Sequence, residues 1–201
     1  MKNKCSAPSP HHLRGGYVIT LSISIVALFI GWVNQFWPVI DWLCFDYQAI
    51  REQGEYWRLI TAHLVHSSTD HLFWDLLVFV FCGYYLEQRQ VRLYVLTLIV
   101  SFINLNLYLL SPLASVLQYS GLSGILYAVM TVAAIEWLNT QKGMSGWLPI
   151  LLIIFKTIME LTQAQSVFVT EGWALDCRSH LAGAISGLLV ILSVRVTAWR
   201  M

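Results

Sequence analysis

The segment from Ser120 to Leu138 reads SGLSGILYAVMTVAAIEWL, with one acidic residue, Glu136, near its end. A segment that spans a bilayer as a helix needs roughly 20 mostly apolar residues. Backbone N–H and C=O groups in lipid must find partners within the segment, which favours a helix. The stretch therefore predicts a transmembrane helix over residues 120–138, with a serine, Ser123, near its start between Gly121 and Gly124.

Five further segments have the length and apolar composition of spanning helices. We expect them at residues 17–37, 71–86, 93–110, 147–161 and 179–196. Of the 201 residues, 57% are hydrophobic and 11% are charged, against about 25% charged in soluble domains. The predicted fold class is an all-α membrane protein, a six-transmembrane-helix bundle. Its membrane domain should cover residues 17–197, between cytoplasmic tails at 1–16 and 198–201.

Basic residues in the connections predict the orientation, because positively charged loops stay in the cytoplasm. The connections on one side hold Lys2, Lys4, Arg14, Arg89, Arg92, Lys142, Arg195 and Arg200, whereas those on the other side hold Arg51, Arg58, Arg178 and most loop acids. Both termini are therefore expected inside. The long connection 38–70 then lies outside, and its aromatic residues favour a position in the membrane interface. Glu87 and Glu136 are expected at the cytoplasmic interface.

Charge and cysteine content exclude several classes of function. A net charge of +1 without an arginine-rich stripe predicts no nucleic-acid partner. The cysteines at 5, 44, 82 and 177 lack metal-ligand spacing; Cys44 and Cys177 fit either a disulfide or two free thiols. The histidines at 63, 66 and 71 match no standard zinc site. We expect neither a metal nor another cofactor.

Polar residues gather where three predicted helices enter the membrane from outside. The helix that starts at residue 71 carries His71 and Asp75. The helix that starts at residue 120 carries Ser123, and the one that starts at residue 179 carries His180. A serine and a histidine at the same depth on different helices can form a nucleophile–base pair. Because ionisable residues inside a membrane are functional by default, these side chains are the candidate active site.

Small residues accompany both candidate catalytic residues. The GLSG sequence at 121–124 leaves N–H groups of a helix start free to donate to an oxyanion. Gly183 and Gly187 follow His180 and would let another helix backbone approach closely. Each motif alone is more typical of helix packing than of catalysis. Lys156 and Glu160, four residues apart, are interpreted as a buried mutual pair.

Taken in order, these motifs resemble those of the rhomboid intramembrane serine proteases. Residues 55–58, EYWR, look like the family's Trp-Arg signature, and residues 87–89, EQR, look like its ExR motif. His66, His71 and Asp75 are similar to HxxxxHxxxN, residues 121–124 match GxSG, and His180, Gly183 and Gly187 match HxxGxxxG. The resemblance extends from about Trp57 to Leu188.

The resemblance implies a Ser–His dyad without a third, acidic member. Ser123 would attack the scissile carbonyl and His180 would take its proton. The residues implied to support the oxyanion or the dyad are His66, His71, Asp75, Gly121, Leu122 and Tyr127, with Gly124, Gly183 and Gly187 in helix packing. The site would open to the periplasmic side of a bacterial inner membrane. Its partners would be the lipid bilayer and single-pass or C-terminally anchored membrane proteins.

Two points stay open at this stage. The family has asparagine where this chain has Asp75: a protonated carboxyl could donate to the oxyanion, and an ionised one could orient His71. The small size, the six helices and the lack of a preceding soluble domain resemble the rhombosortase branch, which removes C-terminal Gly-Gly anchors. General housekeeping proteolysis, a catalytically inactive client-binding protein and a small transporter are the alternatives.

Overall fold

The computed structural model describes residues 16–114, 116–141, 143–163 and 176–198. Their elements, in order, are α1 (Val18–Asn34), α2 (Ile40–Leu43), β1 (Phe45–Asp46), α3 (Tyr47–Gln53), α4 (Arg58–Thr61), α5 (Thr69–Leu109), β2 (Gln118–Tyr119), α6 (Ser123–Thr140), the 3₁₀ helix η1 (Met144–Gly146), α7 (Leu148–Gln163) and α8 (Cys177–Ala198). The described part is therefore mostly helical, in agreement with the predicted all-α class. Lys142, Arg200 and nearly all of the expected tail at 1–16 lie outside the described residues.

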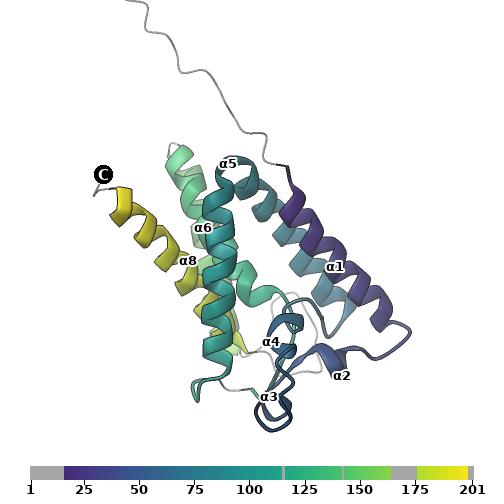
Figure 1. Cartoon of the computed structure of the whole chain (residues 1–201). Helices are drawn as coiled ribbons and strands as arrows, with labels where there is room; N and C mark the ends of the chain where they lie inside the picture. Colours follow the sequence, from purple (N-terminus) through teal and green to yellow (C-terminus); the bar gives the residue numbers. More distant parts are fainter. Residues whose placement is uncertain (1–15, 115, 142, 164–175, 199–201) are drawn as a thin grey trace, which may run out of the picture.

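Helix α5 consists of two helices joined by a reversal of the chain. Gln90 has φ −148° and ψ 68°, far from helical values. Figure 1 shows the two halves of α5 leaving this turn toward the same end of the bundle. They correspond to the segments predicted separately at 71–86 and 93–110.

Among the described residues, two helical stretches, Thr69–Leu109 and Cys177–Val196, have the length and apolar composition of membrane spans, and α1 is a shorter apolar helix. Large apolar side chains are exposed on several helices, such as Phe29 of α1, Ile103 of α5 and Leu192 of α8. Phe29 is 62% exposed. An apolar outer surface of this kind suits lipid rather than water as the main solvent.

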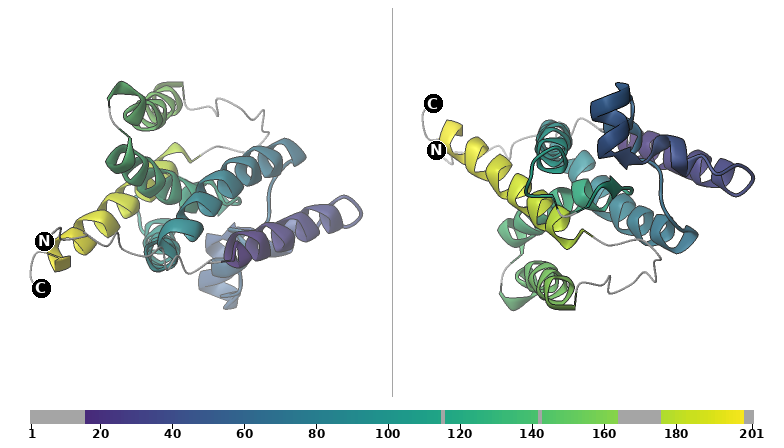
Figure 2. Two further views of the ribbon diagram at one scale, coloured as in Figure 1. Left: turned by 90° about the horizontal axis from the view of Figure 1, so that it is seen from above. Right: turned by 90° about the horizontal axis from the view of Figure 1, so that it is seen from below.

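Helix α6 is central to the bundle and carries the longest run of buried residues, from Ser123 to Val129. Figure 2 shows α1 and α7 at opposite sides of the bundle. Helix α8 packs directly on the α6 backbone: a Cβ added at Gly183 would lie 1.9 Å from the carbonyl oxygen of Gly124, and one at Gly187 would lie 2.7 Å from that of Ala128. Only glycine permits this approach.

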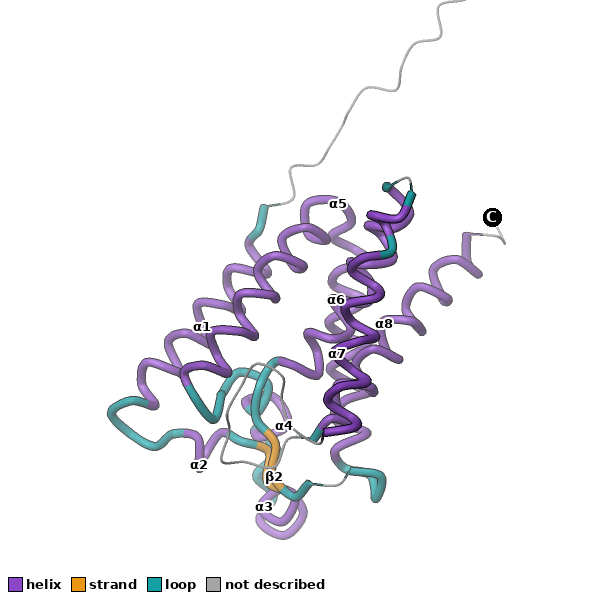
Figure 3. Tube along the Cα trace, turned by 180° about the vertical axis from the view of Figure 1, so that it is seen from behind, coloured by secondary structure: helices purple, strands orange, loops and turns teal. Residues whose placement is uncertain are grey.

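The connection between α1 and α5 folds into short elements at one end of the bundle, opposite the turn within α5 (Figure 3). Strand β1 pairs antiparallel with β2, with Phe45 opposite Tyr119. Buried Arg58 donates to the carbonyl oxygens of Asp41 and Cys44, each at 2.9 Å, and to Glu55 Oε2. The Trp-Arg signature thus has a structural role, since Arg58 ties this connection together.

Glu87 lies close to the turn at Gln90, at the helix end where it was expected, but it is buried between helices rather than exposed at an interface. Its carboxylate is 2% exposed and accepts hydrogen bonds from the backbone N–H groups of Ile19 and Thr20, at 2.8 and 2.9 Å. A carboxylate at a helix N-terminus satisfies free N–H groups and favours the helix dipole. Glu87 therefore fastens the start of α1 to α5. Cys44, Cys82 and Cys177 are free thiols, so Cys44 and Cys177 form no disulfide.

Candidate active site

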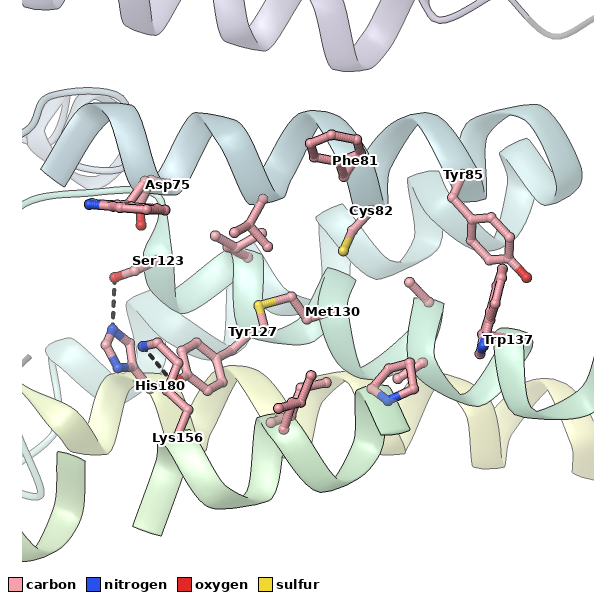
Figure 4. Close-up of a pocket in the computed structure, with 18 of the residues that line it drawn as sticks. Asp75, Phe81, Cys82, Tyr85, Ser123, Tyr127, Met130, Trp137, Lys156 and His180 are labelled. Atoms are coloured by element: carbon pink, nitrogen blue, oxygen red, sulfur yellow. Dashed lines mark hydrogen bonds between the residues drawn. The ribbon is translucent and has the colours of Figure 1, made fainter. Parts of the chain in front are cut away.

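The N-terminal ends of α6 and α8 bring Ser123 and His180 together. Ser123 is the first residue of α6, and His180 lies in the first turn of α8. Both are buried, and Ser123 Oγ lies 2.9 Å from His180 Nε2 (Figure 4). This distance lies within the range expected for a nucleophile and its base. The hydroxyl can donate to Nε2 when the ring carries its proton on Nδ1.

The other side of His180 is held by Glu160 and Tyr127. Nδ1 of His180 lies 2.8 Å from Glu160 Oε2. The Tyr127 ring stacks on the imidazole, with centroids 4.5 Å apart and planes 10° apart. Glu160 also contacts Lys156, so the expected mutual pair forms. The sequence interpretation missed the contact of Glu160 with His180; the available signal was an acid deep in an apolar helix.

The turn that precedes α6 requires glycine at position 121. Gly121 has φ +115°, where L side chains are strained. A Cβ there would also lie 2.6 Å from Cε1 of His71. The Tyr119 hydroxyl donates to the Gly121 carbonyl at 3.0 Å and accepts from the Gly124 N–H at 3.2 Å. These contacts fix the backbone on which Ser123 sits.

His66, His71 and Asp75 form a buried network beside this turn. Asp75 Oδ2 lies 3.2 Å from His66 Nε2 and 3.4 Å from His71 Nε2. The Leu122 N–H donates to His66 Nε2 at 3.3 Å. His71 Nδ1 lies 3.2 Å from the Ser67 hydroxyl. Because His66 Nε2 accepts the Leu122 N–H, it carries no proton to give to Asp75, so His71 is the histidine that an ionised Asp75 can orient.

The same network is the group of described residues that could hold a cation. His66, His71 and Asp75 each offer one ligand atom, and these atoms lie within 4.8 Å of one another. However, these atoms already contact one another and the Leu122 N–H. The network is therefore explained as an oriented pair of histidines without invoking an ion.

His63, the third histidine of this stretch, lies apart from the network. Its Nε2 is 3.2 Å from the Asn106 amide nitrogen, and its ring packs edge-on against Phe102 and Tyr119. Burial lowers the pKa of His63 to about 4, although the bond from Asn106 opposes this shift. His63 is thus a neutral packing residue rather than a catalytic one.

Ser123 and His180 open onto a mostly apolar cavity of about 660 Å³. The cavity lies between the first half of α5, α6 and α7, and it extends from the polar site toward Trp137 and Tyr85 (Figure 4). His71, Asp75, Tyr127 and Lys156 also line it. An apolar cavity with a few convergent polar groups at one end is typical of a substrate site.

Gly183→Ala should reduce the activity of this site by about 10²-fold, because the helices that carry Ser123 and His180 must separate. Contacts of a real Cβ begin near 3.0 Å, whereas this one would lie 1.9 Å from a backbone oxygen. A misplacement of about 1 Å can cost 10²-fold in rate. Initial rates of the reaction at this site measure the effect.

Gly31→Ala is the matched control for this substitution. A Cβ at Gly31 is also crowded, but by the flexible end of the Leu72 side chain. We expect its rate to stay within about threefold of wild type, because a rotamer change relieves the contact. Equal rates for the two variants would contradict a role of Gly183 in the close approach of α8 to α6.

Asp75→Asn should retain activity within about tenfold, whereas Asp75→Ala should lose about 10²-fold or more. The amide of asparagine can still engage His66 and His71, and alanine removes both contacts. Initial reaction rates at matched expression compare the two variants. Complete loss in the asparagine variant would show that the negative charge has a role of its own.

The fold and site define a class: an apolar helical bundle with a buried serine–histidine pair facing a mostly apolar cavity. A family model described as "Rhomboid domain" matches residues 53–196. The chain therefore belongs to the rhomboid family.

Curated relatives agree with this assignment. The chain is 26% identical over 179 residues to the rhomboid protease GlpG of Pectobacterium atrosepticum, covering 86% of this chain and 61% of the relative. It is 30% identical over 155 residues to the GlpG of Klebsiella pneumoniae, covering 75% of this chain and 52% of the relative. It is 27% identical over 180 residues to the rhomboid protease GlpG of Yersinia pestis, covering 86% of this chain and 59% of the relative. The chain thus spans little more than half the length of these relatives.

Proposed function

We propose that this protein is an intramembrane serine endopeptidase that cleaves membrane-anchored proteins near the outer face of a bacterial inner membrane. The observation that carries this proposal is the 2.9 Å contact between Ser123 Oγ and His180 Nε2 at the end of an apolar cavity. Membership of the rhomboid family and the similarity to rhomboid proteases named GlpG support it. The paired serine and histidine argue against an inactive client-binding protein.

In this proposal α1, the two halves of α5, α6, α7 and α8 are the six transmembrane helices. The turn at Gln90 lies between Arg89 and Arg92, which favours the cytoplasmic side. The short elements α2, α3 and α4 lie at the opposite end, which is then the outer, interfacial one. Ser123 and His180 start helices that enter from this end, so the site faces the periplasm, with both termini in the cytoplasm.

Catalysis begins when Ser123 Oγ attacks the scissile carbonyl carbon and His180 Nε2 takes the hydroxyl proton. The Ser123 N–H, at the first position of α6, and a histidine of the network at His66 and His71 stabilise the oxyanion. Collapse of the intermediate breaks the C–N bond, and Nε2 returns its proton to the leaving amine. Water then attacks the acyl-serine by the same steps, with His180 again as base.

We further infer that the substrates carry C-terminal Gly-Gly anchors, as the resemblance to the rhombosortase branch implies. An apolar anchor helix suits the apolar cavity between α5, α6 and α7. The second candidate is general rhomboid proteolysis of single-pass proteins, which the similarity to GlpG relatives favours. Both candidates use the same serine and histidine and differ only in the segment that enters the cavity.

A comparison of proteomes tests the function and separates these candidates. The gene is deleted, and the strain is complemented with wild type, Ser123→Ala or Ser101→Ala. Ser101 is a buried serine whose hydroxyl donates to the Thr97 carbonyl of its own helix, so its variant is the control. Membrane and released fractions are then compared by mass spectrometry.

Accumulation of uncut Gly-Gly-anchored proteins in the deletion and Ser123→Ala strains supports the rhombosortase assignment. Accumulation of other single-pass proteins instead supports the general rhomboid assignment. Equal fractions in all strains would overturn the protease proposal and favour client binding.

A further inference from the structure

Glu160 of α7 is a buried acid in direct contact with the histidine of the site. It is 1% exposed, and its Oε2 lies 2.8 Å from His180 Nδ1. The Tyr127 hydroxyl donates to the same oxygen at 2.7 Å, and the Tyr127 ring stacks on His180. One carboxylate oxygen therefore meets the edge of the imidazole while an aromatic ring covers its face.

Lys156 engages the other oxygen of this carboxylate. Its Nζ contacts Glu160 Oε1 and donates to the Tyr127 hydroxyl at 3.0 Å. A buried charge without a partner costs several kcal/mol, so Lys156 compensates the charge of Glu160. Oε2 is the oxygen that contacts His180 and Tyr127.

The three residues that contact Glu160 lie on three different helices. Glu160 and Lys156 lie on α7, Tyr127 on α6 and His180 on α8. A lysine–glutamate pair at positions i and i+4 forms within one helix and needs no further partner. The approach of Glu160 to His180 is thus an additional feature, which the ion pair alone does not explain.

We propose that Glu160 is a positioning residue that extends the Ser123–His180 pair to a Ser–His–Glu triad. The inference rests on the proposed function and deepens it, since the family resemblance implies only a dyad. Glu160 accepts the Nδ1–H of His180 and so selects the tautomer in which Nε2 is free to accept from Ser123. It also holds the ring in the orientation that the serine requires.

The proton balance of the triad leaves Glu160 ionised throughout. As the Ser123 Oγ–carbon bond forms, the serine proton moves to Nε2, and His180 becomes an imidazolium whose Nδ1–H still donates to Glu160. The negative carboxylate stabilises this positive ring. When the C–N bond breaks, the Nε2 proton moves to the leaving amine, and His180 is neutral again.

The test measures the inactivation of the full-length protein, reconstituted in liposomes, by a fluorophosphonate probe. This probe reacts with an activated serine without a natural substrate. Saturation kinetics separate the limiting rate of inactivation, kinact, from KI, the probe concentration that gives half this rate. Glu160→Gln should lower kinact by about 10²- to 10⁴-fold, because the wrong tautomer of His180 becomes accessible, and should change KI by less than about threefold. Glu160→Asp should recover part of the loss, because it restores a carboxylate.

Lys156→Met is the matched control, since it breaks the same ion pair but leaves Glu160 with His180 and Tyr127. Its kinact should fall by less than about tenfold. Should Glu160→Gln fold poorly because Lys156 loses its partner, Lys156→Met/Glu160→Gln removes both charges, and its kinact should match that expected for the single Gln variant. Thermal unfolding checks that each variant is folded.

The outcomes separate the triad from the protease proposal. If folded Glu160→Gln, or the folded double variant, reacts like Lys156→Met, the triad is overturned while the protease proposal stands. If wild type and Ser123→Ala label equally, both proposals fall together.

Discussion

Ser123→Ala should reduce cleavage by at least about 10⁴-fold while the protein still inserts and folds. Loss of the nucleophile in serine proteases costs as much as about 10⁶ in kcat, because covalent catalysis ends altogether. The substitution removes one oxygen and leaves His180 Nε2 without this hydrogen bond. A buried polar atom left without its partner costs about 1–3 kcal/mol, so we expect a small fall in thermal stability at most.

Cleavage of a membrane-reconstituted, single-pass reporter, followed by gel, measures this loss. Ser101→Ala serves as the control, because Ser101 is buried in α5 with its hydroxyl bonded to its own helix. Its reporter cleavage should stay within about twofold of wild type. Cleavage by Ser123→Ala at more than a tenth of the wild-type rate would show that another group is the nucleophile.

The helices were predictable because apolar segments and charged turns repeat along the chain. The ranges expected at 120–138 and 179–196 differ by a few residues from α6 and α8. The turn at Gln90 falls in the polar run between two apolar segments, where the chain was expected to reverse. Backbone N–H and C=O groups in lipid must form hydrogen bonds within their own segment, which favours a helix for each apolar segment. The type of secondary structure therefore follows from composition.

The small sheet and the burial of Glu87 could not be predicted in the same way. Strands β1 and β2 have two residues each, too few to show alternation, and they pair across more than 70 positions of the chain. Glu87 looked like an interfacial acid because charges are common at helix ends. Its real partners are the N–H groups of Ile19 and Thr20, which only the packing of α1 on α5 brings near.

Sequence reasoning brought together most of the site but not all of it. Glycine spacing and topology suggested that Ser123 and His180 should meet, and their atoms lie within hydrogen-bond distance. Glu160 was assigned to Lys156 because an i, i+4 partner is visible in the sequence. The rotation of α7 about its axis, which turns Glu160 toward α8, depends on packing that no single helix encodes.

His180→Ala should cause a loss of the same order as Ser123→Ala, about 10⁴-fold, and the double variant should lose no more than either single variant. The two side chains act in one step: without the base the serine hydroxyl is a weak nucleophile, and without the serine the base has no proton to take. Residues that act as a unit are grossly non-additive for this reason. The same reporter assay, run on both singles and the double, measures the coupling.

A second pair of substitutions provides the control for this double-mutant comparison. Ser101→Ala combined with Ser123→Ala should show simple additivity, because these residues share no hydrogen bond and act independently. If the losses of Ser123→Ala and His180→Ala instead multiply, the two residues serve separate steps, and the 2.9 Å contact is then not a nucleophile–base pair. If they do not multiply, the residual rate measures what the oxyanion donors and substrate binding contribute on their own, since these remain when both members are removed.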